Sequence, residues 1–233
     1  MAQVTYFGHS CFLVETMGKR ILFDPFITPN ELAKEINLDS IFCDYIFISH
    51  GHGDHLADWE YLANKTGAKI VSSFEICTWI EKKGYTNTHA MNISGDWDFG
   101  FAKVKMVYAA HSNSLPDGTY GGIAAGFVFR NDETCFYYSG DTGLNTDMKL
   151  IAESFLLDFA FLPIGNNYTM NIADATKAAR FVNCNQIIGM HYDTFEFIKI
   201  NHDAAIAEFE SNGLKLTLMN IGESKFFLTK DSF

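Results

Sequence analysis

His50-Gly51-His52-Gly53-Asp54-His55 is the stretch that indicates the fold of this chain. It directly follows an apolar run at residues 45–48, which is typical of a buried strand. Four of the six side chains can bind a metal ion, and the two glycines between them let the backbone turn tightly. Histidine is the commonest metal ligand in proteins and aspartate is a usual oxygen ligand. The stretch therefore predicts a metal centre at the carboxyl end of a strand.

The composition is that of an ordinary globular protein. The chain has 233 residues, of which 48% are apolar and 19% charged, and we expect residues 1–233 to form a single domain. The net charge is −11, and Lys and Arg cluster at most in pairs. Because nucleic-acid binding depends on basic surfaces, this balance argues against nucleic acid as a partner.

The cysteines favour a reducing compartment. All five are scattered singly, mostly within apolar runs, where a thiol behaves as a small core residue. The sequence shows no signal-peptide pattern and no apolar stretch near 18 residues. We therefore expect a soluble, cytoplasmic protein without a membrane partner, and the aromatic excess would permit a homo-oligomer interface.

Strand and helix patterns suggest two sheets. The expected strands are residues 4–7, 10–15, 21–23, 45–49, 69–72, 101–110, 124–129, 134–138, 157–162, 186–189, 214–218 and 224–229. The expected helices are residues 31–35, 56–65, 74–83, 172–182 and 203–211. Two mostly-β stretches are each followed by strands that alternate with helices. This pattern predicts an α+β fold, a four-layer αββα sandwich of two mixed sheets with helices outside.

Three more candidate ligands stand where an expected strand ends. His111 follows residues 104–110, Asp141 follows 136–139 and His191 follows 187–190. Side chains at the carboxyl ends of separate strands can converge on one cleft. For each residue taken alone, the alternative is a buried histidine satisfied by the core or, for Asp141, an ordinary turn residue.

The order His-x-His-x-Asp-His, then His, Asp and a final His, resembles the metallo-β-lactamase-fold superfamily over nearly the whole chain. Shorter segments are similar to a metal-dependent hydrolase family related to bacterial ascorbate-phosphate lactonases; they are residues 8–10, 139–143, 163–165, 168–170, 190–192 and 194–195. Two departures touch the expected substrate rim. Asn166-Asn167 stands where that family has a second glycine, and Asp193 where Asn or Gly is usual.

The resemblance implies a role for each candidate ligand. One ion would be bound by His50, His52 and His111, a second by Asp54, His55 and His191, and Asp141 would bridge them. Two divalent ions about 3.5–4 Å apart lower the pKa of a shared water towards about 7. The metal-bound hydroxide would then attack an ester, lactone or phosphodiester of a small molecule. Zn²⁺ is the first expectation for both ions, with Mn²⁺ or another transition metal as alternatives.

Two further residues are expected to take part in the chemistry. Asp54 would also orient the attacking water or accept its proton. His9 would be a second catalytic residue, with a strand-end histidine bonded to backbone as its alternative. Asp24 is the best candidate for a carboxylate that orients a ligating imidazole.

The expected substrate is a small polar molecule, with anionic compounds included. It would enter through mobile loops at residues 113–122 and 166–170. Asn113, Thr169 and Tyr192 are the candidates for substrate binding.

Two other functions remain open. An iron-dependent oxidoreductase on the same fold would be detected by oxygen consumption after anaerobic loading with Fe²⁺. Against it, sulfur dioxygenases use fewer ligands, and di-iron oxygen reductases generally replace a histidine of the run by a carboxylate. A scaffold protein that has lost its site would bind no metal, whereas all seven candidate ligands are present here.

Overall fold

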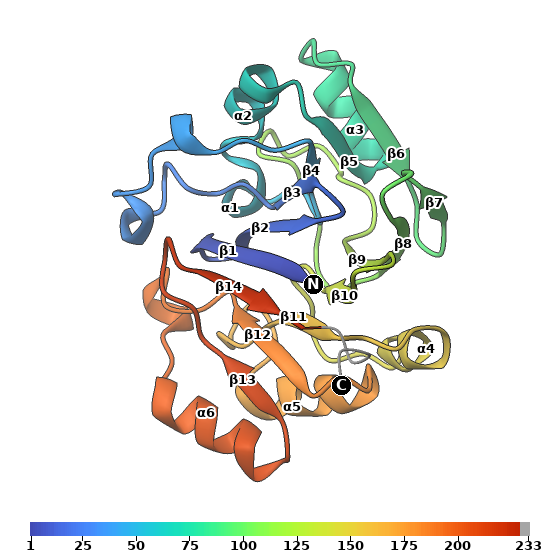
Figure 1. Ribbon diagram of the computed structural model, residues 1–233. Helices are drawn as coiled ribbons and strands as arrows, with labels where there is room; N and C mark the ends of the chain where they lie inside the picture. The colour runs from blue at the N-terminus through green and yellow to red at the C-terminus, as the bar shows by residue number, and fades with distance from the viewer. Residues whose placement is uncertain (229–233) are drawn as a thin grey trace.

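Two seven-stranded sheets lie face to face at the centre of the computed structural model, which describes residues 1–228 (Figure 1). In spatial order the first sheet contains β14 (Ser224–Phe227), β1 (Ala2–Gly8), β2 (Cys11–Thr16), β3 (Lys19–Phe23), β4 (Tyr45–Phe47), β5 (Lys69–Ser73) and β6 (Thr88–Met91). The second contains β13 (Lys215–Thr217), β12 (Gln186–Met190), β11 (Phe159–Pro163), β10 (Cys135–Tyr138), β9 (Ala125–Arg130), β8 (Lys103–Tyr108) and β7 (Asp96–Asp98).

Both sheets are mixed, and in each of them one block of strands pairs antiparallel and the other block pairs parallel. Strands β14, β1, β2 and β3 pair antiparallel, whereas β3 to β6 pair parallel. In the second sheet β7 to β10 pair antiparallel and β10 to β13 pair parallel. Parallel neighbours need a crossover, so most helices fall between the parallel strands. The carboxyl ends of these strands come to one edge of each sheet.

The space between the sheets is filled by aromatic side chains. Phe12, Phe23 and Phe47 of the first sheet pack against phenylalanines of the second in one buried cluster. In the second sheet Phe136 is stacked between Phe129 and Phe159, with ring centroids 4.8 and 5.2 Å apart. This packing accounts for the Phe-rich composition, since neighbouring strands present rings to the same face.

Helices cover the outer faces, as Figure 1 shows. The first sheet is covered by α1 (Gly53–Leu56), α2 (Trp59–Thr66) and α3 (Phe74–Lys82), whose apolar residues form a second buried cluster with that sheet. The second sheet is covered by α4 (Met148–Ser154), α5 (Ile172–Phe181) and α6 (His202–Ser211). The predicted four-layer αββα sandwich is therefore confirmed. Among the described residues, no helix is long and apolar enough to cross a membrane.

The expected elements are found, with local differences. The helix expected over 56–65 is interrupted, since α1 ends at Leu56 and α2 begins at Trp59; between them Asp58 N donates to Pro25 O, and the Asp58 carboxylate accepts from Ile27 N and Thr28 N. The segment at 31–35 contains only a short 3-10 turn, η1 (Glu31–Ala33). Strands β6 and β7 and helix α4 were not predicted. Residues 229–233 of the expected domain, with the end of the strand expected at 224–229, lie outside the described residues.

We expect the stacking of Phe136 to contribute measurably to the free energy of unfolding. Phe136→Ala would remove a fully buried ring and leave a cavity, so we expect the free energy of unfolding to fall by about 3–5 kcal/mol. Urea denaturation followed by circular dichroism measures this. Phe226→Ala is the matched control, because Phe226 is 65% exposed and should change stability by about 0.5 kcal/mol or less. Equal effects of the two substitutions would contradict this description of the core.

Candidate metal centre

All seven predicted ligands come together at the carboxyl ends of strands from both sheets. Residues 50–55 follow β4 in the first sheet. His111, Asp141 and His191 follow β8, β10 and β12 in the second. Backbone hydrogen bonds hold these loops in place: Gly143 N donates to Ala110 O, next to His111, and His191 N donates to His9 O. The ligands therefore stand on two rigid sheets.

His50, His52 and His111 form the first ligand group. Their ligand atoms all lie within 4.8 Å of one another, and His50 Nε2 is 3.0 Å from His52 Nδ1. Two ligands of a tetrahedral zinc, each bound at about 2.0–2.1 Å, lie about 3.3 Å apart. The spacing of this pair therefore suits one shared ion.

Asp54, His55 and His191 form the second ligand group, and His9 lies beside them. Asp54 Oδ2 is 4.0 Å from His55 Nε2 and 3.9 Å from His191 Nε2. The His55 and His191 rings lie nearly parallel, with centroids 5.8 Å apart. This group offers two imidazoles and one carboxylate to a common point.

Asp141 lies between the two groups. Its Oδ2 is 2.8 Å from His191 Nε2, 3.3 Å from His55 Nε2 and 3.7 Å from His111 Nε2. Within the described part of the chain, the buried atoms Asp141 Oδ1 and His55 Nε2 have no hydrogen-bond partner. Because buried polar atoms are normally satisfied, these two orphaned atoms fit a site built for metal ions.

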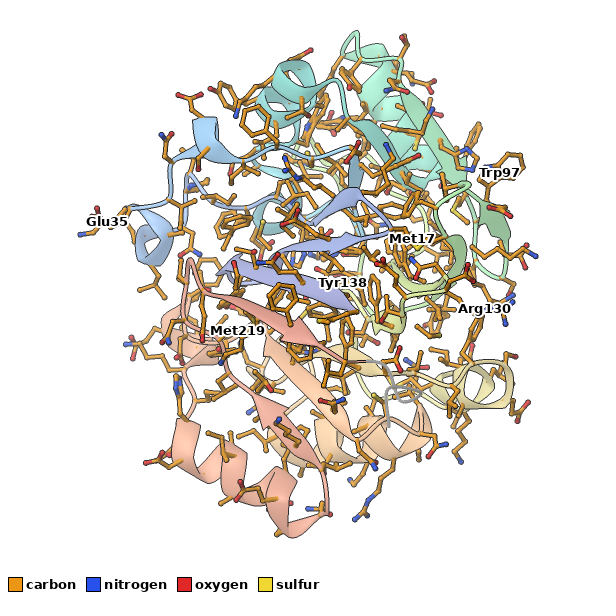
Figure 2. The ribbon with its side chains drawn as sticks, in the orientation of Figure 1. Met17, Glu35, Trp97, Arg130, Tyr138 and Met219 are labelled. Carbon is orange, nitrogen blue, oxygen red and sulfur yellow. The ribbon has the colours of Figure 1, made fainter. Side chains whose placement is uncertain are left out.

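The Asp24 carboxylate lies outside the two ligand groups and orients ligating histidines through hydrogen bonds. It is fully buried and accepts hydrogen bonds from Ser49 N at 2.7 Å, Ser49 Oγ at 2.6 Å and His55 Nδ1 at 2.8 Å. The hydroxyl of Tyr138 in the second sheet donates to Asp24 Oδ2 at 2.7 Å and lies near the centre of the molecule (Figure 2). The prediction that Asp24 orients an imidazole is confirmed for His55.

The same carboxylate sets the tautomer of His50 through Ser49. The single hydroxyl proton of Ser49 is donated to Asp24, so Ser49 Oγ can only accept at its contact with His50 Nδ1, 2.9 Å away. His50 Nδ1 therefore carries the hydrogen, and the Nε2 lone pair is left for an ion. In the same way, His55 Nδ1 donates its hydrogen to Asp24, so Nε2 is the nitrogen of this ring that faces the other ligands.

Burial and neighbouring charges set the protonation of the site. Burial lowers the pKa of His50, His52 and His111 below the ordinary histidine value, which favours the neutral imidazole that binds metals. Burial also lowers the pKa of His55, but the charges of Asp141 and Asp24 outweigh it and raise that pKa well above normal. The pKa of His55 therefore shifts in the opposite direction to those of His50, His52 and His111, because the buried carboxylates Asp141 and Asp24 lie beside it.

His9 borders the second ligand group, with its ring centroid 4.2 Å from that of His191 and a hydrogen bond to Asp54. Its ring is buried, with Nε2 3.2 Å from Asp54 Oδ2 and Nδ1 3.0 Å from Thr194 Oγ1. Burial, together with the charge of His191, lowers the pKa of His9 to about 4, so it is neutral at pH 7. Since a carboxylate only accepts, His9 Nε2 donates to Asp54. The catalytic role of His9 stays a prediction, and this hydrogen bond also suits a residue that positions Asp54.

A cleft of about 860 Å³ opens over the ligands. It is lined by His52, Gly53, Asp54, His111, Ser112, Asp141, Tyr168, His191, Thr194, Phe195, Glu196 and Phe197. The expected loop at 166–170 contributes Tyr168. The loop at 113–122 contributes no lining residue and instead packs on α3, where Trp79 Nε1 donates to Asp117 and Ser73 Oγ to Gly121 O.

The three predicted substrate-binding residues are not among those that line the cleft. Asn113 is buried, and its amide accepts from Gly51 N and donates to Gly121 O, so it holds the loop between two ligating histidines. Tyr192 is buried in the core beneath α5 and α6. Thr169 is only partly exposed, and its neighbour Tyr168 faces the cleft instead. Substrate binding by these three residues therefore stays a prediction, which their positions outside the lining do not support.

Left-handed backbone conformations explain the two departures from the family pattern. Asn166, Asn167 and Asp193 have φ of 65°, 57° and 62°. Glycine adopts this region freely, and Asn and Asp are the other residues that tolerate it best. The substitutions keep the backbone that glycine would allow. His191 itself has φ of 55°, which turns a ligand towards the cleft at the end of β12.

Sequence reasoning missed the wall that follows β12. Thr194, Phe195, Glu196 and Phe197 line the cleft, together with Ser112 on the opposite side. Phe195 and Phe197 lie close together in the loop that follows β12 and were a usable signal of a cleft wall, because an ordinary polar loop would need no aromatic rings. The family motif ends at Phe195, so it gave no indication that Glu196 and Phe197 also line the cleft.

Comparison with known proteins agrees with this geometry. Residues 3–191 match the family model described as a β-lactamase superfamily domain. A UPF0173 metal-dependent hydrolase of Methylacidiphilum infernorum is 47% identical over 222 residues, which are 95% of this chain and 98% of that protein. A second protein of that name, from Flavobacterium johnsoniae, is 48% identical with the same coverage.

A solved structure extends the likeness to three dimensions. Igni18, described as a novel metallo hydrolase from the hyperthermophilic archaeon Ignicoccus hospitalis, is 34% identical and superimposes with a TM-score of 0.90. The match covers 98% of this chain and 99% of Igni18. Sequence and fold agree over nearly the full length, and the chain belongs to the UPF0173 metal-dependent hydrolases of the metallo-β-lactamase superfamily.

Proposed function

We propose that this hydrolase uses two divalent metal ions to cleave an ester, lactone or phosphodiester bond of a small molecule. The observation that carries the proposal is the position of Asp141. One carboxylate oxygen lies 2.8–3.7 Å from ligand nitrogens of both groups, as expected of a bridging ligand. Three nitrogen donors on one side, and two nitrogens with a carboxylate on the other, suit Zn²⁺ first and Mn²⁺ or another transition metal as alternatives.

The residues divide the work as follows. One ion would be held by His50, His52 and His111, the other by Asp54, His55 and His191, with Asp141 shared. When bound, the ions supply a water of lowered pKa and a Lewis acid for the reacting oxygen. Asp54 lines the cleft, and His9 holds it by a hydrogen bond to Oδ2.

Proton transfer is assigned to Asp54. In ester hydrolysis the oxygen of water bonds to the acyl carbon and the acyl–oxygen bond to the alcohol breaks. One proton of the water passes through Asp54 to the leaving oxygen. The hydrogen bond from His9, together with the charge of His55, holds the pKa of Asp54 below its ordinary range although burial raises it. A low pKa keeps this carboxylate ionised, so it can bind an ion and would hold a proton only in passing from the water to the leaving oxygen.

Hydrolysis assays with controlled metal content test the function. We expect the metal-free protein to be inactive towards p-nitrophenyl esters or bis(p-nitrophenyl) phosphate, and Zn²⁺ or Mn²⁺ to restore activity. His52→Ala should lower the rate more than about 100-fold, because losing a ligand should exceed the effect of losing an outer hydrogen-bond partner. His89→Ala changes a histidine outside the site and is the matched control. Turnover that is independent of metal would contradict the proposal.

The orienting role of Asp24 gives a second prediction. Asp24→Asn would disturb the hydrogen bond that fixes His55, so we expect metal affinity to fall about 10–100-fold. Competition with a fluorescent chelator measures this affinity. Asp58→Asn is the matched control, since Asp58 is also buried and also accepts backbone hydrogen bonds, but at Ile27 and Thr28. A loss of affinity as large in Asp58→Asn would show that only folding was affected.

The positioning role of His9 gives a third prediction. His9→Gln should lower kcat by about tenfold while KM and bound metal stay close to the wild-type values, because only the orientation of Asp54 is disturbed. Steady-state kinetics combined with elemental analysis separates the effects. If metal content fell in parallel with kcat, His9 would instead act as a ligand.

Two remaining proposals concern the alternative chemistry and the surroundings. The iron-dependent oxidoreductase is the second candidate, and oxygen consumption by Fe²⁺-loaded protein without ester turnover would favour it over hydrolysis.

We propose a small-molecule substrate, cytoplasmic location and no nucleic-acid or membrane partner, supported by the net charge of −11 and five buried cysteines. A homo-oligomer is compatible with exposed aromatics such as Phe42 and Tyr120.

A further inference from the structure

The wall of the cleft is aromatic on one side. Tyr168 follows β11, and Phe195 and Phe197 follow β12, so all three rings come from loops of the second sheet. Their exposed fractions are 54%, 39% and 73%. Exposed rings grouped beside a polar site indicate a surface that a ligand covers.

The cleft offers no side-chain cation to a negatively charged group. Among the described residues, no Lys or Arg lines it. The carboxylates Asp54, Asp141 and Glu196 do, and Glu196 pairs with Lys199 Nζ at 2.5 Å, outside the lining. Asp54 and Asp141 would be neutralised by the ions that they hold, and Glu196 is paired, so a charged tail beside the aromatic rings would find no unpaired Arg or Lys to bind it.

The aromatic wall is held in place by its own loop. Asp193 Oδ1 accepts from Ile200 N at 3.1 Å, and Asp193 Oδ2 is 2.6 Å from His202 Nε2. The Phe195 ring packs edge-on against His9, with centroids 5.5 Å apart. Because these contacts hold the loop and the Phe195 ring, that ring needs little ordering when a ligand covers it.

We infer that the substrate carries no charge outside its reacting group and that an apolar or aromatic group of it lies against Tyr168, Phe195 and Phe197, with the bond to be cut above the ligand groups. This inference rests on the proposed function and narrows its substrate class. It also replaces the expectation of an anionic substrate. Only the reacting group meets the ions, and the remainder of the molecule meets apolar rings.

Two p-nitrophenyl esters with the same leaving group and the same reacting acyl carbon test the charge preference. p-Nitrophenyl hexanoate carries an apolar chain, and mono-p-nitrophenyl adipate has a chain of the same length that ends in a carboxylate. With metal-loaded protein we expect kcat/KM for the hexanoate to be at least about tenfold higher, because its terminal methyl can be buried against the rings whereas a terminal carboxylate would lose water there without a partner. Equal values, or a preference for the adipate, would overturn the inference.

Variants of Phe197 test whether the wall is responsible. Phe197→Ala should lower kcat/KM for the hexanoate about fivefold and lower that for p-nitrophenyl acetate less, because the acetate has no chain to cover. Phe197→Lys should shift the preference towards the adipate. Phe74→Ala is the matched control, as Phe74 is 61% exposed and lies away from the cleft. Unchanged chain preference in both Phe197 variants would contradict the assignment.

A binding measurement separates this inference from the proposed hydrolysis. Ligand-detected NMR would compare 4-nitrophenyl hexyl ether with 6-(4-nitrophenoxy)hexanoate, which cannot be hydrolysed as esters. We expect the neutral ether to bind more tightly to wild-type protein and to lose this advantage in Phe197→Lys. If no ester is cleaved but the ether binds in this way, the hydrolytic function fails and the inference stands. If the anionic ether binds equally or more tightly, the inference fails even when esters are cleaved.

Discussion

The buried carboxylate of Asp24 is the constraint on which the site depends. A charge without access to water is tolerated only when its oxygens are hydrogen-bonded, and here Ser49, His55 and Tyr138 supply the donors. Ser49 directly precedes the ligand stretch, His55 is its last residue, and Tyr138 lies in the opposite sheet. One group therefore fixes the end of β4, the tautomers of two histidines and the approach of β10. The Phe-rich core brings the sheets together, and Asp24 sets how their edges meet.

The floor of the cleft, which consists of the seven candidate ligands, and its aromatic wall are positioned by different kinds of structure. The floor stands at strand ends, where backbone hydrogen bonds and a buried carboxylate leave little freedom, so the geometry suits the strict distances of metal coordination. The wall stands on two loops whose left-handed residues are Asn and Asp rather than Gly. Loops can change without disturbing the floor. Relatives with the same ligands can therefore differ in the molecules they accept, and in this chain the wall is formed by Tyr168, Phe195 and Phe197.

The sequence predicted the floor well because its signals are local. Residues 50–55 form one dense run, and His111, Asp141 and His191 each end a strand whose apolar pattern is clear. The substrate residues were predicted poorly, because a one-residue difference decides whether Tyr168 or Thr169 faces the cleft. Asn113 and Tyr192 are polar residues near ligands, yet backbone bonds and core packing occupy them. Strand β7 was missed since all three of its residues are exposed and lack an alternating pattern.

The central claim is that seven side chains from both sheets hold two ions with Asp141 between them. Anomalous diffraction from crystals of the protein loaded with Zn²⁺ or Mn²⁺ tests it most directly, because the metal positions are located without reference to activity. We expect two anomalous peaks about 3.5–4 Å apart, one near His50, His52 and His111 and the other near Asp54, His55 and His191. A single peak at full loading, or two peaks that do not share Asp141, would contradict the claim.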